Sequence, residues 1–141
     1  PLIRREMQDE FLRLQQLLNK TIVFITHDFD EALRLADRIA IMKDGAVEQC
    51  DTPDQIVLHP ATEYVRKFTE EIDKARVVHA ETLIEDGLSA DGDPVDAGAS
   101  VQSLAKLLIQ DTRSAIPVAK DGTVIGALSR EIALGILVGT E

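Results

Sequence analysis

The sequence has very few of the residues that build disulfides, metal sites or membrane spans. It has one cysteine, Cys50, so no disulfide can form within the chain. Its three histidines lie far apart without the spacing of zinc ligands, and we expect no metal site. No apolar run approaches the ~20 residues of a membrane-spanning helix, and there is no signal-like segment at the start. We therefore expect a cytosolic chain that meets a membrane only through a partner protein.

Positive charge is also scarce. The chain has 15 Lys and Arg against 25 Asp and Glu, a formal net charge of -10. Nonspecific nucleic-acid binding depends on Lys and Arg that neutralise phosphates. The composition therefore argues against a nucleic-acid partner.

The most informative feature present is a short apolar run that ends in a histidine. Residues 21–26 are rich in β-branched side chains and bounded by polar ones, which is typical of a strand covered on both faces in a parallel sheet. Ligands of such α/β sheets bind at the carboxyl ends of the strands, so His27 would stand where a phosphate could bind. A structural hydrogen-bonding role for His27 is the alternative. We expect Asp28 to cap the next helix and not to take part in chemistry.

Local signals predict the other elements of the first half. Apolar residues at three- and four-residue steps predict a first helix, Asp44-Gly45 predicts a hairpin turn, and Thr52-Pro53 predicts a helix start. The expected elements are a helix from 2 to 18, a strand 21–26, a helix beginning at Asp28 or Asp30, strands 38–42 and 46–50, and a helix that carries Tyr64, Val65, Phe68 and Ile72 and ends near Lys74.

The composition changes between Glu85 and Ser100, where a turn-rich, acidic stretch predicts a loop or linker. Beyond it, the pattern predicts a small α+β unit. Its expected elements are a helix from 101 to 110 capped by Ser100, a strand 115–119, a turn at 121–122, a strand 123–129 and a helix 131–138.

The first half resembles the last third of an ABC-transporter ATPase domain. Thr26-His27-Asp28 is similar to the end of that family's switch region, residues 1–4 to the end of its D-loop, and residues 37–45 to its closing hairpin. Residues 52–56 and 59–61 resemble the helical tail of importer ATPases. The resemblance covers residues 1 to about 72. Within the superfamily, the sequence of this stretch is most similar to the ATPase subunits of glycine betaine, proline and choline importers.

This resemblance implies that His27 is the switch histidine, which contacts the γ-phosphate of ATP in the intact protein. The family's other catalytic parts are absent from the sequence: the G-x-x-x-x-G-K-[ST] phosphate loop, the strand ending in Asp-Glu that holds magnesium, and the Ser-Gly-Gly-Gln signature. We therefore expect the C-terminal piece of a longer ATPase that uses ATP and Mg, with no ATP hydrolysis by this chain alone.

Residues from about 79 to 139 resemble a cystathionine-β-synthase (CBS) regulatory motif. The resemblance rests on residues 114–118 and 121–126. CBS motifs work in pairs and in some cases bind adenine or cyclic nucleotides, which implies that a second motif comes from another copy. Gly126 and Ser129 match the family's nucleotide pattern, but Ile132 stands where an Asp for the ribose belongs. The nucleotide site at Gly126 and Ser129 is therefore a weak prediction.

These resemblances divide the chain into a C-terminal part of an ABC ATPase domain (1–75) and a single regulatory or dimerising CBS motif (76–141). They imply a transmembrane permease subunit, a substrate-binding protein and a second copy as partners, on the inner face of the cell membrane. A stand-alone CBS nucleotide-sensing or dimerisation module remains the alternative. Without neighbouring strands, we expect residues 21–26 to expose their apolar side chains, which favours self-association or a repacked 1–45 region. The transported solute is not fixed by the sequence.

Overall fold

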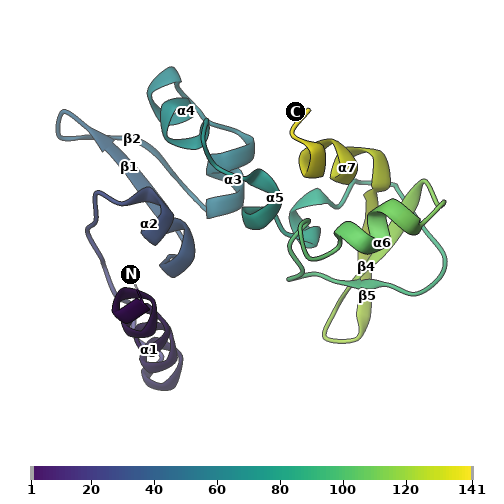
Figure 1. Ribbon diagram of the computed structural model, residues 1–141, viewed down its shortest axis with the longest axis horizontal. Coiled ribbons are helices and arrows are strands. Elements are labelled where there is room, and N and C mark those ends of the chain that lie inside the picture. Colours follow the sequence, from purple (N-terminus) through teal and green to yellow (C-terminus); the bar gives the residue numbers. More distant parts are fainter. Residues whose placement is uncertain (1, 141) are drawn as a thin grey trace.

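The computed structural model describes residues 2–140, with side chains from Glu6 onward. It is a mixed α/β structure with two hydrophobic cores, which lie side by side along its longest axis (Figure 1). Short helices in the middle of the chain, α3 (Pro53–Leu58) and α5 (Lys74–Val77), lie between them. The α/β class expected from the sequence is confirmed. Pro1, part of the resemblance to a D-loop, lies outside the described residues.

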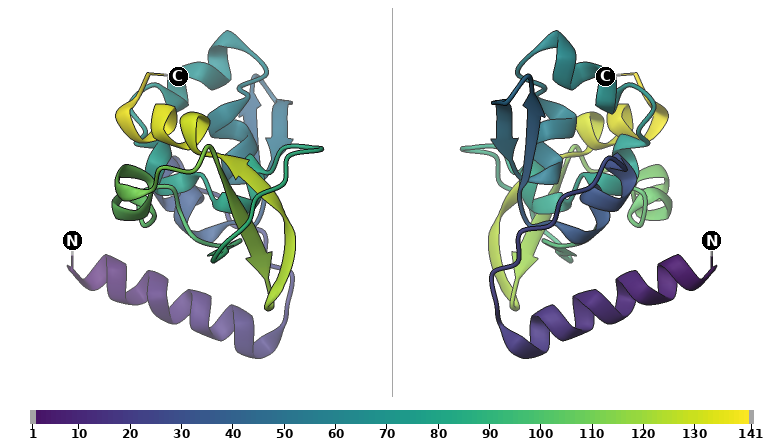
Figure 2. Two further views of the ribbon diagram at one scale, coloured as in Figure 1. Left: turned by 90° about the vertical axis from the view of Figure 1, so that its right-hand side faces the viewer. Right: turned by 90° about the vertical axis from the view of Figure 1, so that its left-hand side faces the viewer.

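The first helix, α1 (Leu2–Leu18), has the extent that the sequence predicted, but it projects from the rest of the molecule (Figure 2). Polar contacts link it to α2 (Phe29–Leu35): Arg34 Nη2 lies 2.6 Å from Asp9 Oδ1, and Gln8 Nε2 donates to Glu31 at 3.0 Å. The rings of Phe11 and Phe24 lie 6.1 Å apart. The helix is thus held by surface contacts, and its apolar positions Met7, Leu14, Leu17 and Leu18 are exposed.

The predicted strand over residues 21–26 does not form, and this prediction was wrong for the chain as it stands. The segment has no strand assignment and belongs to neither of the sheets in the described residues. Its apolar side chains face solvent, with Val23 89% and Ile25 92% exposed. A strand of a parallel sheet needs neighbours that pair its backbone groups and cover both faces. Nothing in residues 2–140 supplies them, so the side chains are exposed as expected.

The first core is built by α2, a hairpin and two helices. Strands β1 (Ile39–Lys43) and β2 (Ala46–Asp51) pair antiparallel around Asp44 and Gly45, whose φ angles of 50° and 81° fit a two-residue hairpin turn. Helix α3 and helix α4 (Glu63–Thr69) pack against the hairpin and α2. The buried members of this core are Ile39, Ile41, Ile56 and Val65. The predicted hairpin and helix starts are confirmed.

The helix predicted through Tyr64 to near Lys74 ends early, and a separate helix begins at its expected end. Helix α4 ends at Thr69, whose hydroxyl donates to the carbonyl of Arg66 at 2.9 Å. Asp73 then begins α5, because its side chain accepts from the backbone N–H of Ala75. Ile72 therefore lies outside both helices. The N-cap at Asp73 provides a new helix start where the sequence pattern predicted an ending.

A three-stranded sheet forms the second core. Along the chain, one helix precedes its antiparallel strand pair and another follows it. The order is β3-β4-β5, with β3 (Val95–Asp96) parallel to β4 (Ala115–Lys120) and β4 antiparallel to β5 (Thr123–Ser129). A 3₁₀ helix, η1 (Ala80–Leu83), precedes them, and α6 (Ala105–Gln110) and α7 (Arg130–Val138) complete the unit. Its largest fully buried side chains include Leu108, Ile116 and Leu128.

The expected elements of this unit are present, with two differences. Residues 101–104 form turns, so α6 begins at Ala105, and Ser100 caps the turn by accepting from the backbone N–H of Ser103. The acidic stretch predicted as a linker contains β3 and packs on the unit. Val95 pairs with Val118, and Arg113 Nη1 donates to the carbonyl of Asp91 at 2.8 Å. Such long-range pairing has no local sequence signal.

Candidate functional site

His27 lies in the turn between the extended segment and α2, and it is exposed. The residues on either side of it hold the turn. Asp28 N donates to Thr26 Oγ1 at 3.0 Å, Thr26 Oγ1 donates to Glu31 Oε2 at 2.8 Å, and Glu31 N donates to Asp28 Oδ1 at 3.1 Å. Asp28 thus caps α2, as the sequence predicted. This Thr26-Asp28-Glu31 network fixes the backbone at His27 and leaves the imidazole facing solvent.

An exposed imidazole next to an ordered helix start can contact a phosphate oxygen that another element brings to it. The described residues contain no group of three or more His, Cys, Asp and Glu that could hold a metal ion. A half-open cavity of about 270 Å³ lies beside the start of α2, and His27 does not line it. The cavity is lined by Asp28, Phe29, Asp30, Lys67, Phe68, Glu71 and Ile72.

Gly126 and Ser129 lie on β5, in the other half of the molecule from His27 (Figure 1). Ser129 Oγ accepts from the backbone N–H of Ile132 at 3.4 Å and caps α7. A Cβ at Gly126 would lie 2.4 Å from Ile84 Cγ2, so the glycine allows close packing. Ile132 packs against the second core. All three residues thus have structural roles, and the structure does not bring them together with His27.

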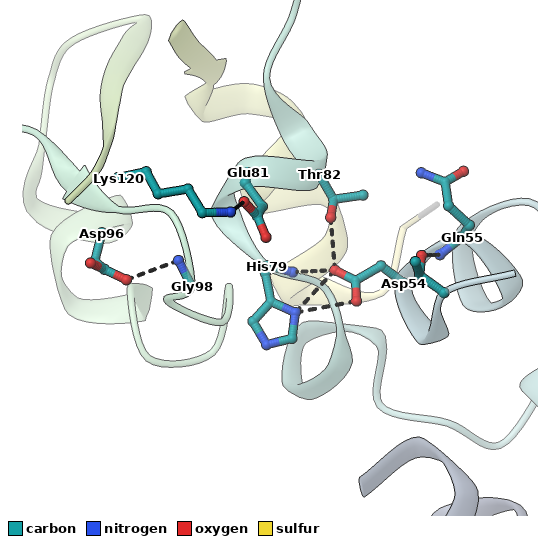
Figure 3. A network of polar contacts seen from close by, with 9 residues as sticks. Asp54, Gln55, His79, Glu81, Thr82, Asp96, Gly98 and Lys120 are labelled. Atoms are coloured by element: carbon teal, nitrogen blue, oxygen red, sulfur yellow. Dashed lines mark hydrogen bonds and ion pairs between the residues drawn. The ribbon is translucent and has the colours of Figure 1, made fainter. Parts of the chain in front are cut away.

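A buried carboxylate that sequence reasoning missed joins the two halves. The exposed fraction of Asp54, in the first turn of α3, is only 8%. Its Oδ2 accepts from the backbone N–H of His79 at 2.9 Å and from Thr82 Oγ1 at 2.8 Å, and His79 Nδ1 lies 3.0 Å from the same oxygen (Figure 3). We call Asp54, His79 and Thr82 the joint. The partners are 25 and 28 residues away, so only the fold reveals it.

A second polar contact closes the loop before β3. Arg113 Nε lies 3.0 Å from both carboxylate oxygens of Asp111, and the Arg113 backbone N–H donates to Asp111 Oδ1 at 2.9 Å. These hydrogen bonds stabilise the ionised carboxylate and lower the pKa of Asp111 to about 2. Since Arg113 also holds the Asp91 carbonyl, this pair fixes the acidic stretch to the sheet.

Comparison with known proteins gives long, close matches to transport proteins. The chain is 75% identical over 138 residues to the trimethylamine N-oxide transport system ATP-binding protein TmoW of Ruegeria pomeroyi, covering 98% of this chain and 41% of that protein. It is 52% identical over 130 residues to the TmoW protein of Pelagibacter ubique, covering 91% of this chain and 38% of that protein. The chain thus spans about two fifths of the length of these relatives.

Other matches are shorter or more distant. The glycine betaine transport ATP-binding protein OpuAA of Bacillus subtilis is 55% identical over 80 residues, which cover 57% of this chain and 19% of that protein. A solved CBS domain-containing protein of unknown function from Kribbella flavida has 18% identity and a TM-score of 0.30, covering 74% of this chain and 79% of that chain. No protein-family model matches the sequence. Among the described residues, no helix is long and apolar enough to cross a membrane.

Proposed function

We propose that this chain is the C-terminal portion of the ATP-hydrolysing subunit of a quaternary-amine importer. It matches ATP-binding proteins of trimethylamine N-oxide and carnitine transport over about nine tenths of its length or more, and one of glycine betaine transport over 57% of it. The observation that carries this proposal is the 75% identity over 98% of the chain. It supports the resemblance that residues 26–28 and 37–45 indicate.

In this proposal, His27 is the switch histidine. It contacts the γ-phosphate and positions the attacking water when the rest of the subunit brings ATP and Mg to it, a positioning and electrostatic role that phosphoryl transfer requires. The Thr26-Asp28-Glu31 network supports this role because it orders the backbone on both sides of an exposed imidazole. The phosphate loop and the magnesium-holding carboxylate lie elsewhere in the subunit, so this chain alone does not hydrolyse ATP.

We propose small methylated amines as the first candidates for the transported solute. Two relatives that match 98% and 91% of the chain, at 75% and 52% identity, are named for trimethylamine N-oxide. A carnitine transport protein matches 89% of the chain at only 38% identity, and OpuAA, named for glycine betaine, matches 57% of it. A separate substrate-binding protein and the permease select the solute, and they are the partners that we propose. The subunit would sit on the inner face of the membrane through the permease.

We propose that the second half is a single CBS motif with a regulatory or dimerising role. Support comes from its order of elements, β3-α6-β4-β5-α7, with a parallel and an antiparallel pair in one sheet. The motif would pair with that of a second copy. An adenine or cyclic nucleotide, if it binds, would lie near Gly126 and Ser129, but without a carboxylate at Ile132 for the ribose.

The direct test is the coding sequence upstream of Pro1. The proposal expects an in-frame G-x-x-x-x-G-K-[ST] segment and a strand ending in Asp-Glu. A stop codon immediately upstream would exclude the ATPase assignment. The remaining function would then be a small CBS protein that senses a nucleotide or dimerises, and equilibrium dialysis with AMP, ATP and cyclic dinucleotides would distinguish the two.

A further inference from the structure

We propose that Asp54 is a positioning residue, which couples the C-terminal unit to the segment that carries His27. The proposal rests on the proposed function, because it assigns a regulatory input to the same histidine. It follows from the place of α3 between the two cores and from the hydrogen bonds that Asp54 receives from the second half.

The joint links the two halves through a carboxylate that has little access to water. Asp54 is 8% exposed, and its oxygens accept from one backbone N–H and one hydroxyl of residues 79–82 (Figure 3). The imidazole nitrogen Nδ1 of His79 lies 3.0 Å from Oδ2. A buried carboxylate that loses such partners has a large desolvation cost. The halves are therefore held in one relative position at this point.

Helix α3 contributes side chains to both cores, so the hydrogen bonds of Asp54 fix its position relative to both. Ile56, with no exposed surface, belongs to the first core, and Leu58 packs against the second. Phe29 and Ala32 of α2 pack against the same first core as Ile56. Because α2 begins directly after His27 and is capped by Asp28, a shift of α3 moves the helix that sets the backbone at His27.

The contacts thus form a continuous chain: Thr82 and His79, then Asp54, then Ile56, then Phe29 and the start of α2. Closely packed cores have low compressibility and transmit strain. A change in the C-terminal unit, such as dimerisation, would therefore reach His27 through this chain. Spatial continuity alone is not coupling, so the test must measure coupling directly.

The test uses the full-length subunit assembled with its permease. Thr82→Val removes one hydrogen bond to Asp54 with little change of shape, and Asp54→Asn removes the charge. The matched control is Glu81→Gln on the same 3₁₀ helix. It removes the negative charge from the exposed ion pair between Glu81 and Lys120, whose atoms lie 2.8 Å apart, and does not involve Asp54. Substitutions along such a network of contacts change the coupling between sites by about twofold to thirtyfold.

We expect Thr82→Val and Asp54→Asn each to lower kcat for ATP by about threefold to tenfold, with KM for ATP unchanged within about twofold. The double variant should be no worse than Asp54→Asn alone, because both changes break one joint. Glu81→Gln should leave kcat unchanged. Unchanged kcat in Thr82→Val and Asp54→Asn, or additive losses in the double variant, would overturn the proposal.

Amide hydrogen exchange on the chain itself separates this proposal from the proposed function. Thr82→Val should speed exchange at Ala32 of α2 and at its C-cap, Ala36, and leave exchange in β5 unchanged. Equal acceleration in α2 and β5 would mean general destabilisation and would overturn the positioning role. If the full-length wild-type subunit hydrolyses no ATP, the proposed function fails, and the exchange result still decides whether the joint couples to α2.

Discussion

At the scale of single residues, several residues of this chain contribute to close packing or to hydrogen bonding and not to chemistry. Gly126 has no side chain where Ile84 crosses β5, and Ile84 in turn bridges to Leu128. Asp111 is held ionised by Arg113. These roles can be separated by substitutions that change one contact each.

Replacing Gly126 with Ala should destabilise the chain by about 1 to 3 kcal/mol, because the new methyl group would lie 2.4 Å from Ile84 Cγ2. Urea unfolding measures the loss. The same change in an Ile84→Ala background, where the crowding methyl is gone, should cost clearly less. Equal costs in the two backgrounds would contradict the steric explanation.

The Asp111 carboxyl should make stability depend on pH. Its folded pKa of about 2 lies below its usual value, so the ionised group contributes stability that is full above about pH 4 and is lost as the pH falls toward 2. The difference in stability between wild type and Asp111→Asn should therefore be constant from pH 7 to about 4 and shrink below it. Thermal unfolding across this range measures it. A difference that does not shrink below pH 4 would contradict the assignment.

At the scale of elements, α3 is the short helix on which both cores depend. It carries Asp54, Ile56 and Leu58, and Thr52 caps it by accepting from the backbone N–H of Gln55 at 3.4 Å. Six residues make a marginal helix without tertiary contacts. The cap therefore contributes to the interface between the halves as well as to the helix.

Thr52→Ala should lower the free energy of unfolding by about 1 kcal/mol, because it leaves the backbone N–H of Gln55 without its acceptor. Thr52→Ser keeps the hydroxyl and serves as the control, with little loss expected. The midpoint of urea unfolding reports both. If Ser and Ala destabilise equally, the cap does not account for the helix start.

The elements that the sequence predicted correctly are those with local signals. Asp44-Gly45 and Asp121-Gly122 set hairpin turns by their positive φ angles, and Thr52-Pro53 starts α3. Predictions that depend on distant residues failed: β3 was missed, and the strand predicted over residues 21–26 does not form. Val95 pairs with Val118, and the segment around Val23 has no partner strand among residues 2–140. The break after Thr69 was missed because the Asp73 cap competes with an apolar pattern that continues to Ile72.

The candidate site divides in the same way. The motif around His27 and the cap at Asp28 are local, so they could be predicted from the sequence. The cap that Ser129 provides for α7 is equally local, since its hydroxyl accepts from the backbone N–H of Ile132, but the sequence analysis did not identify it. The close packing at Gly126 could not be predicted, because it depends on Ile84, which is distant in the sequence. Asp54 gave no sequence signal beyond an acidic residue in a first helical turn.

At the scale of the whole molecule, apolar surface is exposed to solvent at one end. The projecting α1 and the extended segment after it expose apolar side chains on described residues, including Leu17 at 73% and Ile25 at 92%. Contiguous apolar surface of this kind marks an interaction site or an association liability. In the proposed function, the remainder of the ATPase subunit covers it.

The chain on its own should therefore self-associate through residues 22–25. Val23→Lys together with Ile25→Lys should shift sedimentation velocity toward monomer, since both side chains are almost fully exposed and their replacement disturbs no core. Met42→Lys, at an exposed apolar position on the hairpin, is the control and should not change association. A wild-type chain that stays monomeric at all concentrations would contradict this expectation.

The central claim is that this chain supplies the switch histidine of a transport ATPase. The most direct measurement is ATP turnover by the full-length subunit with its permease, comparing wild type and His27→Ala. We predict a loss of about 100-fold or more in kcat, since His27 would position the water and the γ-phosphate. Turnover by His27→Ala equal to that of the wild type would contradict the claim.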